Sequence, residues 1–259
     1  MTLTDLHQAF PILPTNPPPL GNVLVLIPTL DEAANITELL ERVRRSVPAA
    51  DVLVIDDGST DGTRRRAEVA ASTLGRIRVW HRPGPRGLGE AYRAGFALAL
   101  AEGYGVVAQM DADLSHDPRY LGALVDAIGA GADVAIGSRY VPGGSTPGWP
   151  VRRRALSRAG GLYARTLLSL EAHDVTSGYR AYRADVLRRI DLGAIDSTGF
   201  GFQIDMTDRA ERAGAVVVEI PIAFRDRVAG TSKISRRIVG EALTLVTRRA
   251  LDRRKQGRR

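Results

Sequence analysis

The sequence predicts an α/β fold with a doubly wound, mostly parallel sheet. Short apolar runs rich in Val and Ile alternate with segments of helical spacing, a pattern typical of strands joined by crossover helices. Carboxylates directly follow three of these runs, and ligands of such sheets bind beyond the carboxyl ends of the strands. The 259 residues suffice for one large domain, and the sequence shows no internal repeat and no separate second domain.

The first half of the chain contains five expected strands, at 22–28, 51–56, 77–81, 104–110 and 133–138. Helical spacing lies between them, at 32–47, 62–74, 89–102 and 118–130. This alternation predicts parallel strands with right-handed crossovers. A Gly/Pro-rich loop then precedes expected helices at 151–170 and 184–213, a strand at 215–222 and a final helix at about 232–253.

The expected organisation is a tail, one globular domain and a C-terminal helix. Residues 1–20 contain five prolines, which predicts a loose tail, and they lack the pattern of a signal peptide. The domain is expected over 21–231, and an amphipathic basic helix and tail over 232–259. No stretch approaches the roughly 18–20 apolar residues of a membrane span.

The net charge of +7 is concentrated near the C-terminus. Residues 225–259 hold 12 basic and 3 acidic groups, whereas the first 224 residues hold 24 basic and 26 acidic groups. The excess therefore favours a local anionic partner or solubility over nucleic-acid binding. Cysteine is absent, which excludes disulfides and thiolate metal sites and fits a cytoplasmic protein.

Two glycine-containing segments are candidates for ligand-binding loops. The segment GLGEAYRAG at 87–95 misses the G-x-G-x-x-G spacing, so a dinucleotide-binding oxidoreductase is disfavoured. In IDDGSTDGT at 55–63, turn and N-cap chemistry predicts a structural role for Asp61 and Thr63. A helix cap needs one acceptor and this segment has several, so Asp57 at the strand end is available for another role. Its carboxylate can accept hydrogen bonds from a base or ribose.

The segment VVAQMDADLSHDP at 106–118 ends an apolar strand in carboxylates spaced two apart. One interpretation is a turn that caps the next helix. The other is a cation site, because Asp111 and Asp113 can converge on one hard cation and leave positions for diphosphate oxygens. Mg²⁺ or Mn²⁺ suits such oxygen ligands and would neutralise charge on a diphosphate leaving group. For His116 we expect a supporting polar role near the helix start.

Seven ordered motifs over residues 22–234 resemble glycosyltransferase family 2, and within it the polyprenyl-phosphate (dolichyl-phosphate) mannose synthases. They are PTLDE, VIDDGSTDGT, MDADLSHDP, GSRYVPGG, the W-x-x-R-R pattern at 149–153, SGYRAYR and EIPIAFRDRVAGTSK. The resemblance implies a glycosyltransferase A-type, Rossmann-like fold of the single-domain type without transmembrane helices.

The resemblance also implies how the donor is bound. Relatives have Gln or Ser where this chain has Ser115, and Leu30 replaces the Tyr of the commoner PTYNE, which removes an aromatic wall from the base pocket. Two residues, Arg227 and Lys233, would close over the diphosphate, with Gly230 giving their loop its freedom. The guanosine pocket would consist of Pro28, Leu30, Glu32, Ile55 and Asp57. The metal and diphosphate of GDP-mannose would be held by Asp111, Ala112, Asp113 and Ser115.

For the acceptor, the resemblance implies a phosphate site built from Arg139, Arg153, Ser157 and Arg158. Arginine forks suit phosphate oxygens. Neighbouring Arg152 and Arg154 fit a solvated helix face equally well. Three further residues, Asp174, Ser177 and Arg180, would organise the acceptor side, in either a catalytic or a structural role. The catalytic set would be Asp113, Arg139, Arg153, Arg227 and Lys233.

The final helix offers contact with a membrane. Its apolar residues fall on one arc, and its arginines would be attracted to anionic headgroups by about 1 kcal/mol per basic residue. An amphipathic helix lying on the surface and an ordinary helix packed on the core are both open. We therefore expect a peripheral protein on the cytoplasmic face of the membrane, bound through this helix or anchored by a partner membrane protein.

These expectations define an inverting transfer of mannose from GDP-mannose to a polyprenyl phosphate. Another hexosyl donor, such as a glucosyl nucleotide, is the first alternative. A non-catalytic module that binds anionic lipid or nucleic acid is the alternative of another class. Such a module explains the basic tail but not the strand-end carboxylates.

Overall fold

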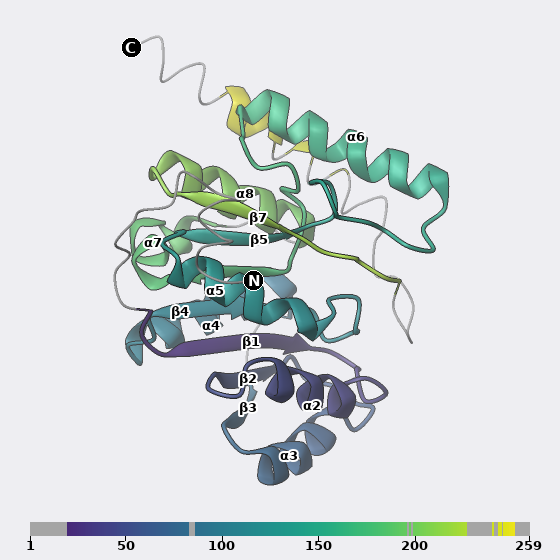
Figure 1. The fold of residues 1–259 in the computed structure, drawn as a ribbon, viewed down its shortest axis with the longest axis vertical. Helices are drawn as coiled ribbons and strands as arrows, with labels where there is room; N and C mark the ends of the chain where they lie inside the picture. Colours follow the sequence, from purple (N-terminus) through teal and green to yellow (C-terminus); the bar gives the residue numbers. More distant parts are fainter. Residues whose placement is uncertain are drawn as a thin grey trace.

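The computed structural model describes residues 20–82, 86–195, 197, 199–226, 240, 243–244 and 246–251, and these form a sheet between layers of helices (Figure 1). The strands are β1 (Val23–Thr29), β2 (Asp51–Asp56), β3 (Ile77–His81), β4 (Val106–Gln109), β5 (Val134–Ser138), β6 (Arg180–Arg183) and β7 (Val217–Pro221). The α-helices are α2 (Ile36–Ser46), α3 (Thr63–Leu74), α4 (Leu88–Ala101), α5 (Leu121–Gly129), α6 (Val151–Leu168), α7 (Ala184–Arg189) and α8 (Gly199–Arg212). Short 3₁₀ helices occupy Pro118–Tyr120 and Leu192–Ala194.

The described strands form one seven-stranded sheet in the order β3-β2-β1-β4-β6-β5-β7. Strand β6 is antiparallel to its neighbours β4 and β5, and all other pairs are parallel. The chain winds outward from β1 through β2 to β3 and then returns to β4 on the other side of β1. The boundary between β1 and β4 is therefore a switch point, where doubly wound sheets bind their ligands.

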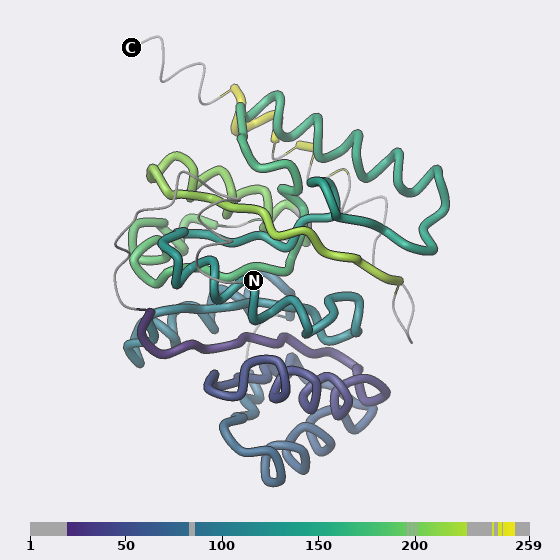
Figure 2. The backbone as a smooth tube through the Cα atoms, in the orientation of Figure 1, coloured from purple at the N-terminus to yellow at the C-terminus, as the bar shows by residue number. Residues whose placement is uncertain are grey.

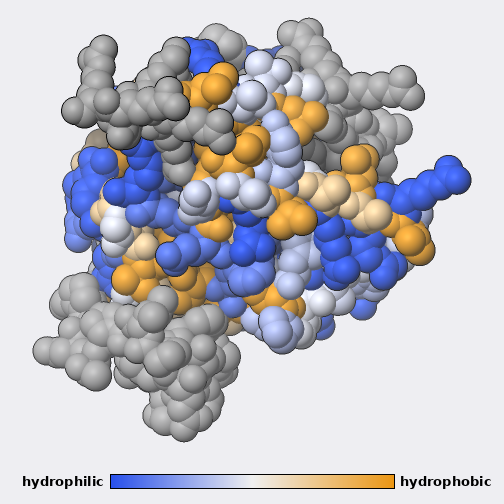
Figure 3. All heavy atoms as spheres, turned by 90° about the horizontal axis from the view of Figure 1, so that it is seen from above, coloured by the Kyte–Doolittle hydropathy of each residue, from blue (hydrophilic) through white to orange (hydrophobic). Residues whose placement is uncertain are grey.

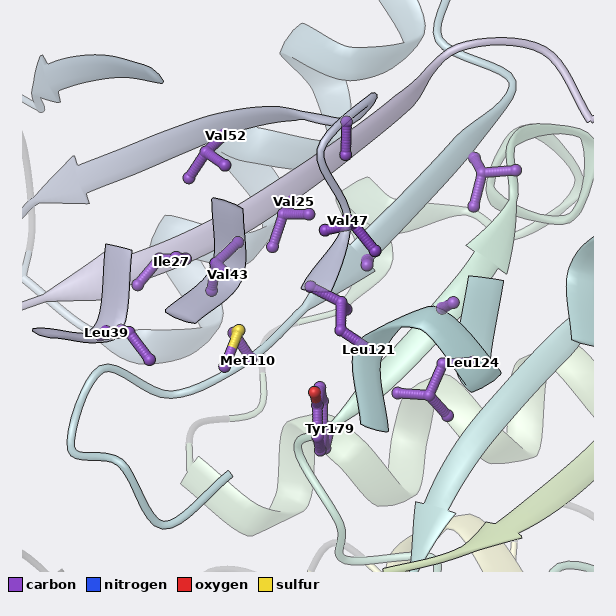
Figure 4. Close-up of a cluster of buried hydrophobic side chains, with 14 of the residues drawn as sticks. Val25, Ile27, Leu39, Val43, Val47, Val52, Met110, Leu121, Leu124 and Tyr179 are labelled. Carbon is purple, nitrogen blue, oxygen red and sulfur yellow. The ribbon is translucent and has the colours of Figure 1, made fainter. Parts of the chain in front are cut away.

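Both faces of the sheet are buried, which explains the unbroken apolar run of β1. Val25 and Ile27 face the layer of α2, α3 and α5 (Figure 4), whereas Leu24 and Leu26 face the layer that includes α4, α7 and α8. Successive side chains of a strand point to opposite faces, so a strand covered on both sides needs apolar residues throughout. Each fully buried Leu or Ile contributes about 1.5–3 kcal/mol.

The predicted α/β class and the parallel strands of the first half are confirmed, but in the second half one expected helix is interrupted and one strand was not expected. The expected helix at 184–213 is interrupted, because Asp191 accepts hydrogen bonds from the N–H groups of Gly193 and Ala194 and starts a separate 3₁₀ turn. Strand β6 was not predicted. It has four residues with an arginine at each end, too short and too polar to show a strand pattern.

The described part of the C-terminal segment packs beside α6 and on the core (Figure 2). Val246 and Ala250 are buried, and Arg249 forms an ion pair with Asp205 of α8 at 2.9 Å. These two apolar residues therefore face the protein, as the core-packing alternative requires. The described part leaves out residues 1–19, 227–239 and 252–259. Most of what the sequence predicts for the N-terminal tail and the C-terminal helix therefore stays a prediction. Among the described helices, none has the length and apolar character to cross a bilayer.

Candidate active site

Three adjacent strands bring the predicted donor residues to one edge of the sheet. The N–H of Asp57 donates to the carbonyl of Thr29 at 3.1 Å, so the end of β2 lies against the end of β1. The N–H of Met110 donates to the carbonyl of Leu26 at 3.2 Å, which places the end of β4 on the other side of β1. The residues after β1, β2 and β4 therefore meet at the switch point.

Asp61 and Thr63 join the loops after β1 and β2, which confirms their predicted structural role. Asp61 accepts hydrogen bonds from the N–H groups of Ala33 and Thr63, and the Thr63 hydroxyl accepts one from the N–H of Glu32 at 2.7 Å. Partial burial acts to raise the pKa of Asp61, but the hydrogen bonds from Thr63 and Ala33 outweigh it and leave that pKa below its ordinary value.

Asp57 is held in place by the protein on both carboxylate oxygens. Its Oδ1 accepts a hydrogen bond from Nε of Arg82 at 2.7 Å, and its Oδ2 accepts one from the N–H of Gly87 at 3.0 Å. Both side chains of the ion pair are 7% exposed. Arg82 was not singled out from the sequence, because it stands alone after β3 in no recognisable motif. The pair fixes the orientation of Asp57 at the rim of the predicted base pocket.

The other predicted pocket residues differ in exposure. Pro28 and Leu30 are half-buried at the end of β1, whereas the side chain of Ile55 is fully buried in the core. The backbone of Ile55 is buried as well, and its carbonyl accepts a hydrogen bond from the Thr29 hydroxyl at 3.4 Å, so Ile55 would support the predicted pocket without contacting a nucleoside. Glu32 is half-buried, and its carboxylate accepts a hydrogen bond from the amide of Asn35 at 2.9 Å.

After β4 the chain turns sharply through a left-handed residue. Leu114 has φ of +61°, a conformation that costs a non-glycine residue about 1 kcal/mol or more. In this turn Oδ1 of Asp113 accepts a hydrogen bond from the N–H of Ser115 at 3.1 Å. The residue of this segment that caps the next helix is Asp117. It accepts a hydrogen bond from the N–H of Arg119 and starts the 3₁₀ helix.

The residues of this turn suit a hard cation. The side chain of Asp111 is 33% exposed, whereas Ala112 and Asp113 are each 4% exposed and Ser115 is 2% exposed. The hydroxyl oxygen of Ser115 is buried without a hydrogen-bond partner among the described residues. No group of three or more His, Cys, Asp or Glu side chains in the described part of the chain could hold a metal ion. Two carboxylates and this hydroxyl fit Mg²⁺ or Mn²⁺ whose remaining ligands come from a diphosphate and water.

His116 stabilises the turn by binding the backbone of Asp111. Its Nδ1 accepts a hydrogen bond from the N–H of Asp111 at 3.0 Å, and its ring stacks on Tyr179 at 4.9 Å between centroids. Burial lowers the pKa of His116 despite the nearby carboxylates of Asp111 and Asp113. A neutral imidazole that orients Asp111 agrees with the supporting role expected for it.

Gly178 lies next to the carboxylate of Asp111. A Cβ at this position would lie 3.7 Å from Oδ1 of Asp111 and 3.5 Å from Nε2 of Gln203. Gln203, from α8, accepts a hydrogen bond from the amide of Gln109, which also donates to the carbonyl of Gly178. Because β6 is antiparallel, the loop that enters it reaches the same edge of the sheet as the end of β4.

Among the residues predicted to bind the acceptor phosphate, Arg139 forms a buried ion pair. Its Nε and Nη2 donate to the two carboxylate oxygens of Asp174 at 2.7 and 2.6 Å, and its backbone N–H donates to the same carboxylate at 2.9 Å. Burial opposes both charges, but their attraction holds the pKa of Asp174 below and that of Arg139 above the ordinary values. The side chain of Arg139 is 6% exposed, so a ligand phosphate has little access to its fork.

The loop before β6 is held by its own buried groups. Arg180 is fully buried and donates to the carbonyls of Val175 and Ser177, and the Ser177 hydroxyl donates to the carbonyl of Gly137 at 2.6 Å. Of the two roles left open for Asp174, Ser177 and Arg180, these contacts favour the structural one.

Two aromatic rings order the remaining acceptor residues. The guanidinium of Arg153 lies 4.0 Å from the centroid of Trp149 and forms an ion pair with Asp226. The hydroxyl of Tyr140 donates to the Ser157 hydroxyl at 2.6 Å. Arg158 lies over the same tyrosine ring at 5.6 Å. The structure therefore gathers Arg153, Ser157 and Arg158 on one side of α6.

Three aromatic rings, those of His116, Phe224 and Trp149, connect the turn after β4 with the loop before α6. Phe224 contacts the ring of His116 at 5.4 Å and that of Trp149 at 5.5 Å, both edge-on. The loop that carries Trp149 pairs with the segment after β7, since the N–H of Ser145 donates to the carbonyl of Ile222 and the N–H of Phe224 donates to the carbonyl of Ser145, each at 2.9 Å. Phe224 was not predicted, because a single phenylalanine after a strand carries no signal of its own.

The fold places the carboxylates after β2 and β4 at the edge where doubly wound α/β proteins bind their ligands, which defines the class of the protein. Residues 24–191 match Glycosyl transferase family 2, and the chain belongs to this family. It is therefore a glycosyltransferase, as predicted.

Three relatives are similar over most of this chain. A polyprenol monophosphomannose synthase of Mycolicibacterium smegmatis is 50% identical over 87% of this chain and 85% of its own length. An undecaprenyl-phosphate mannosyltransferase of Micrococcus luteus is 50% identical over 92% and 97%. A dolichol-phosphate mannosyltransferase of Pyrococcus furiosus is 34% identical over 87% of this chain but 63% of its own.

Solved structures of the same fold come from a more distant relative. Glucosyl-3-phosphoglycerate synthase of Mycobacterium tuberculosis, in complex with Mn²⁺, UDP-glucose and phosphoglyceric acid, superposes with a TM-score of 0.67 over 96% of this chain and 84% of its own. Its complex with Mg²⁺ and UDP gives 0.66 over 96% and 84%. At 21% and 20% identity these likenesses establish the glycosyltransferase A-type fold alone.

Proposed function

We propose that the protein transfers mannose from GDP-mannose to a polyprenyl phosphate, giving a β-linked polyprenyl phosphomannose and GDP. The observation that carries the proposal is the 50% identity to two polyprenyl-phosphate mannosyltransferases over 87% and 92% of the chain, a length that includes both charged sides of the site. A module that only binds anionic lipid would have no need for the carboxylates at the end of β4.

The donor would lie across the switch point. Its guanosine would rest against Pro28, Leu30 and Glu32, with Asp57 held by Arg82 at the rim and the buried Ile55 supporting the end of β2. The diphosphate would lie at the turn after β4. That turn would provide Asp111, Asp113 and Ser115 for Mg²⁺ or Mn²⁺ and Ala112 for the diphosphate, and the bound cation would supply positive charge to the leaving group. Arg227 and Lys233 lie outside the described residues, and closing over the diphosphate stays a prediction for them.

The acceptor phosphate would meet Arg153, Ser157 and Arg158, which the aromatic rings gather along α6. For Arg139 we propose a different contribution. Its fork is bound to Asp174, and its guanidinium lies within 5.7 Å of the ring centroids of Tyr140, Trp149 and Phe224. Arg139 would thus position the rings that order Arg153 and Arg158, while its own charge is neutralised by Asp174.

In the reaction, an oxygen of the polyprenyl phosphate would attack the anomeric carbon as the bond to the diphosphate oxygen breaks. Attack from the face opposite the leaving group inverts the configuration. The phosphate oxygen is already ionised near neutral pH, so no proton has to be removed and no strong base is required. The neutral, buried His116 agrees with this, since its Nδ1 is occupied by the N–H of Asp111.

The lipid acceptor implies work at a membrane surface. The proposed location is peripheral, on the cytoplasmic face, with the basic C-terminal residues or a partner membrane protein contributing to attachment. The 12 basic and 3 acidic groups of residues 225–259 support attraction to anionic headgroups.

A donor panel tests the proposal. GDP-mannose, GDP-glucose and UDP-glucose are each incubated with a short, water-soluble polyprenyl phosphate and Mn²⁺, and lipid-linked sugar and released nucleotide are measured. We expect product from GDP-mannose that requires both the cation and the lipid phosphate, and a β-linkage by NMR. Faster transfer from another donor would assign the protein to the hexosyl alternative, and hydrolysis without the lipid phosphate would reject the acceptor.

A further inference from the structure

Buried polar groups mark a ligand site more specifically than the hydropathy of the surface does. Seen from the side on which α6 lies, the surface mixes hydrophobic and hydrophilic residues (Figure 3). In native proteins nearly every buried polar atom has a hydrogen-bond partner, so a buried atom without one calls for an explanation. Among the described residues, Gln109, Ser115 and Gln203 each have such an atom near the end of β4. The Ser115 hydroxyl suits the cation, and the unpartnered atom of Gln203 borders Gly178, next to Asp111.

The amide of Gln203 has one possible orientation. The Gln109 amide binds the carbonyl of Gly178 at 3.0 Å, so its Nε2 has to lie on that side. The same Nε2 donates to Gln203 at 2.9 Å, so Gln203 has to present its Oε1 there. Nε2 of Gln203 is therefore turned away from Gln109, and it lies 3.5 Å from where a Cβ of Gly178 would be. Gln203 is 2% exposed, so this donor is buried.

Gly178 is a glycine for which the protein itself provides no reason. Its backbone is not in the left-handed region that favours glycine. Among the described residues, a Cβ would meet only ordinary van der Waals contacts, at 3.5 Å from Gln203 and His116 and 3.7 Å from Asp111. Gly178 is only half-buried. A glycine with neither a conformational nor a packing reason is typical of a place where the backbone approaches a ligand closely.

The polar atoms around Gly178 suit a hydroxyl group. Nε2 of Gln203 can only donate a hydrogen bond, and the carboxylate of Asp111 can only accept one. A hydroxyl group accepts and donates at once, so it can satisfy both. The side chain of Asp111 is 33% exposed, which leaves its carboxylate accessible to a ligand. A phosphate is disfavoured here, since its ionised oxygens cannot donate to a carboxylate.

The order of the strands indicates which ligand carries this hydroxyl. Across the sheet, β2, β1, β4 and β6 are successive neighbours. The predicted base pocket lies at the ends of β1 and β2, and the predicted diphosphate site lies at the end of β4. Gly178 stands in the loop that enters β6, the next strand. In a nucleotide sugar the sugar follows the diphosphate, so a donor laid across this edge would bring its sugar to Gly178.

We propose that Gly178 and Gln203 hold the transferred sugar, and that Gln203 selects it through one hydroxyl group. Gly178 would let the sugar approach the backbone, Nε2 of Gln203 would donate to the hydroxyl oxygen, and the hydroxyl would donate to Asp111. The proposal rests on the proposed function and deepens it, because it assigns the choice of sugar to named residues. Gln203 lies on α8, outside the seven motifs that resemble the family.

Gly178→Ala tests the close approach. The added methyl group fits the protein, so thermal unfolding should change little, but the methyl would occupy space that the sugar needs. We expect kcat/KM for GDP-mannose to fall by at least about tenfold. The Kd for GDP with Mn²⁺, measured by calorimetry, should stay within about twofold, because GDP has no sugar.

Gly122→Ala on α5 is the matched control. A Cβ at Gly122 would also meet only an ordinary contact among the described residues, 3.8 Å from the carbonyl of Ser46. This variant should keep both kcat/KM and the Kd for GDP within about twofold of the unmodified protein.

A cycle of protein and substrate changes tests the hydroxyl group. Gln203→Met removes the amide donor, whereas Gln109 keeps its bond to the carbonyl of Gly178. GDP-mannose is compared with its four monodeoxy forms, which lack the hydroxyl at carbon 2, 3, 4 or 6 of the sugar. One deoxy form should lose about three- to tenfold in kcat/KM with the unmodified protein, the range for a neutral hydrogen bond. The same form should lose less than about twofold with Gln203→Met.

Equal losses for every deoxy form in both proteins would overturn the proposal and leave a buried water as the partner of Gln203. A Gly178→Ala variant that loses GDP and GDP-mannose binding to the same extent would overturn it in favour of a structural role. If the donor panel selects another nucleotide sugar, the proposed donor fails by itself. The same comparisons with that donor, its deoxy forms and its nucleoside diphosphate would then decide the roles of Gly178 and Gln203.

Discussion

The two sides of the site differ in how the protein uses their charged residues. On the donor side, a third of the Asp111 side chain is exposed at the end of β4, within a turn held by the left-handed Leu114. On the acceptor side, Arg139 is buried and bound to Asp174, whereas Arg153 lies near the surface against Trp149. Matching a motif therefore locates a residue in the fold but leaves open whether its charge faces a ligand or another side chain.

The largest effect is expected at the carboxylates. Asp113→Ala should reduce mannosyl transfer by at least about 10³-fold, because charge on the leaving diphosphate would lose its cation. Thermal unfolding should change little, since the site is at a strand end. Asp117→Ala is the matched control in the same segment, and it should lose about 1 kcal/mol of stability while keeping activity, since it removes only a cap. Near-normal turnover of Asp113→Ala with metal still required would contradict the assignment.

The next largest effect is expected when the buried Arg139–Asp174 pair is broken, and it is a loss of folding stability. Arg139→Met should cost about 3–5 kcal/mol in urea unfolding, because it leaves Asp174 buried without its counterion. Arg139→Lys should restore little of this, since an ammonium cannot reproduce the bidentate contact. Full stability with a selective loss of acceptor binding would instead return Arg139 to the phosphate site.

The same pair predicts a pH dependence. The pKa of Asp174 is depressed, so its contribution to stability is present above the unfolded value of about 3.9 and is lost as pH falls through the folded value. The stability difference between the unmodified protein and Asp174→Asn/Arg139→Met should therefore shrink in acid, measured as urea midpoints from neutral pH downward. A difference that persists unchanged below that range would show that the pair contributes through packing alone.

A smaller and more selective effect is expected at Arg153. Arg153→Ala should raise the KM for the lipid phosphate by about 10–100-fold, the range for losing a charged hydrogen bond, and leave GDP binding unchanged. Arg152→Ala, one residue away on the solvent side of α6, is the matched control and should change neither. Equal losses for both ligands by calorimetry would remove the distinction between donor and acceptor sides.

The smallest effect is expected at Asp226, which pairs with Arg153 in the partly exposed position where the phosphate would bind. Asp226→Asn should lower the acceptor KM by up to about fivefold, since an exposed pair contributes about 0.2–1 kcal/mol. The gain should disappear at high salt. An increase in KM would show that Asp226 orders Arg153 and does not compete for it.

Features that depend on a local residue pattern could be predicted from the sequence. Contacts between segments that are distant in the chain could not. Asp111 and Asp113 were expected at the ligand edge because an apolar strand ends directly before them. The bonds from Arg139 to Asp174 and from Arg82 to Asp57 join residues 35 and 25 positions apart, and nothing in either segment alone announces its partner. Strand β6 escaped detection for a related reason, since it is stabilised by neighbours that precede it in the chain.

The position of β6 also has a consequence for synthesis on the ribosome. Strands β1 to β4 can pair as soon as they emerge, but β4 and β5 are not adjacent and are joined only through β6, about 70 residues after β4. Until residues 180–183 are made, each presents an open edge, and pairing over such separations is slow. The loop at Gly178 and the partner of Arg139 arrive with the same segment. Gln203, Phe224 and Asp226 follow later still, so a truncated nascent chain contains the donor edge without the groups that complete the site.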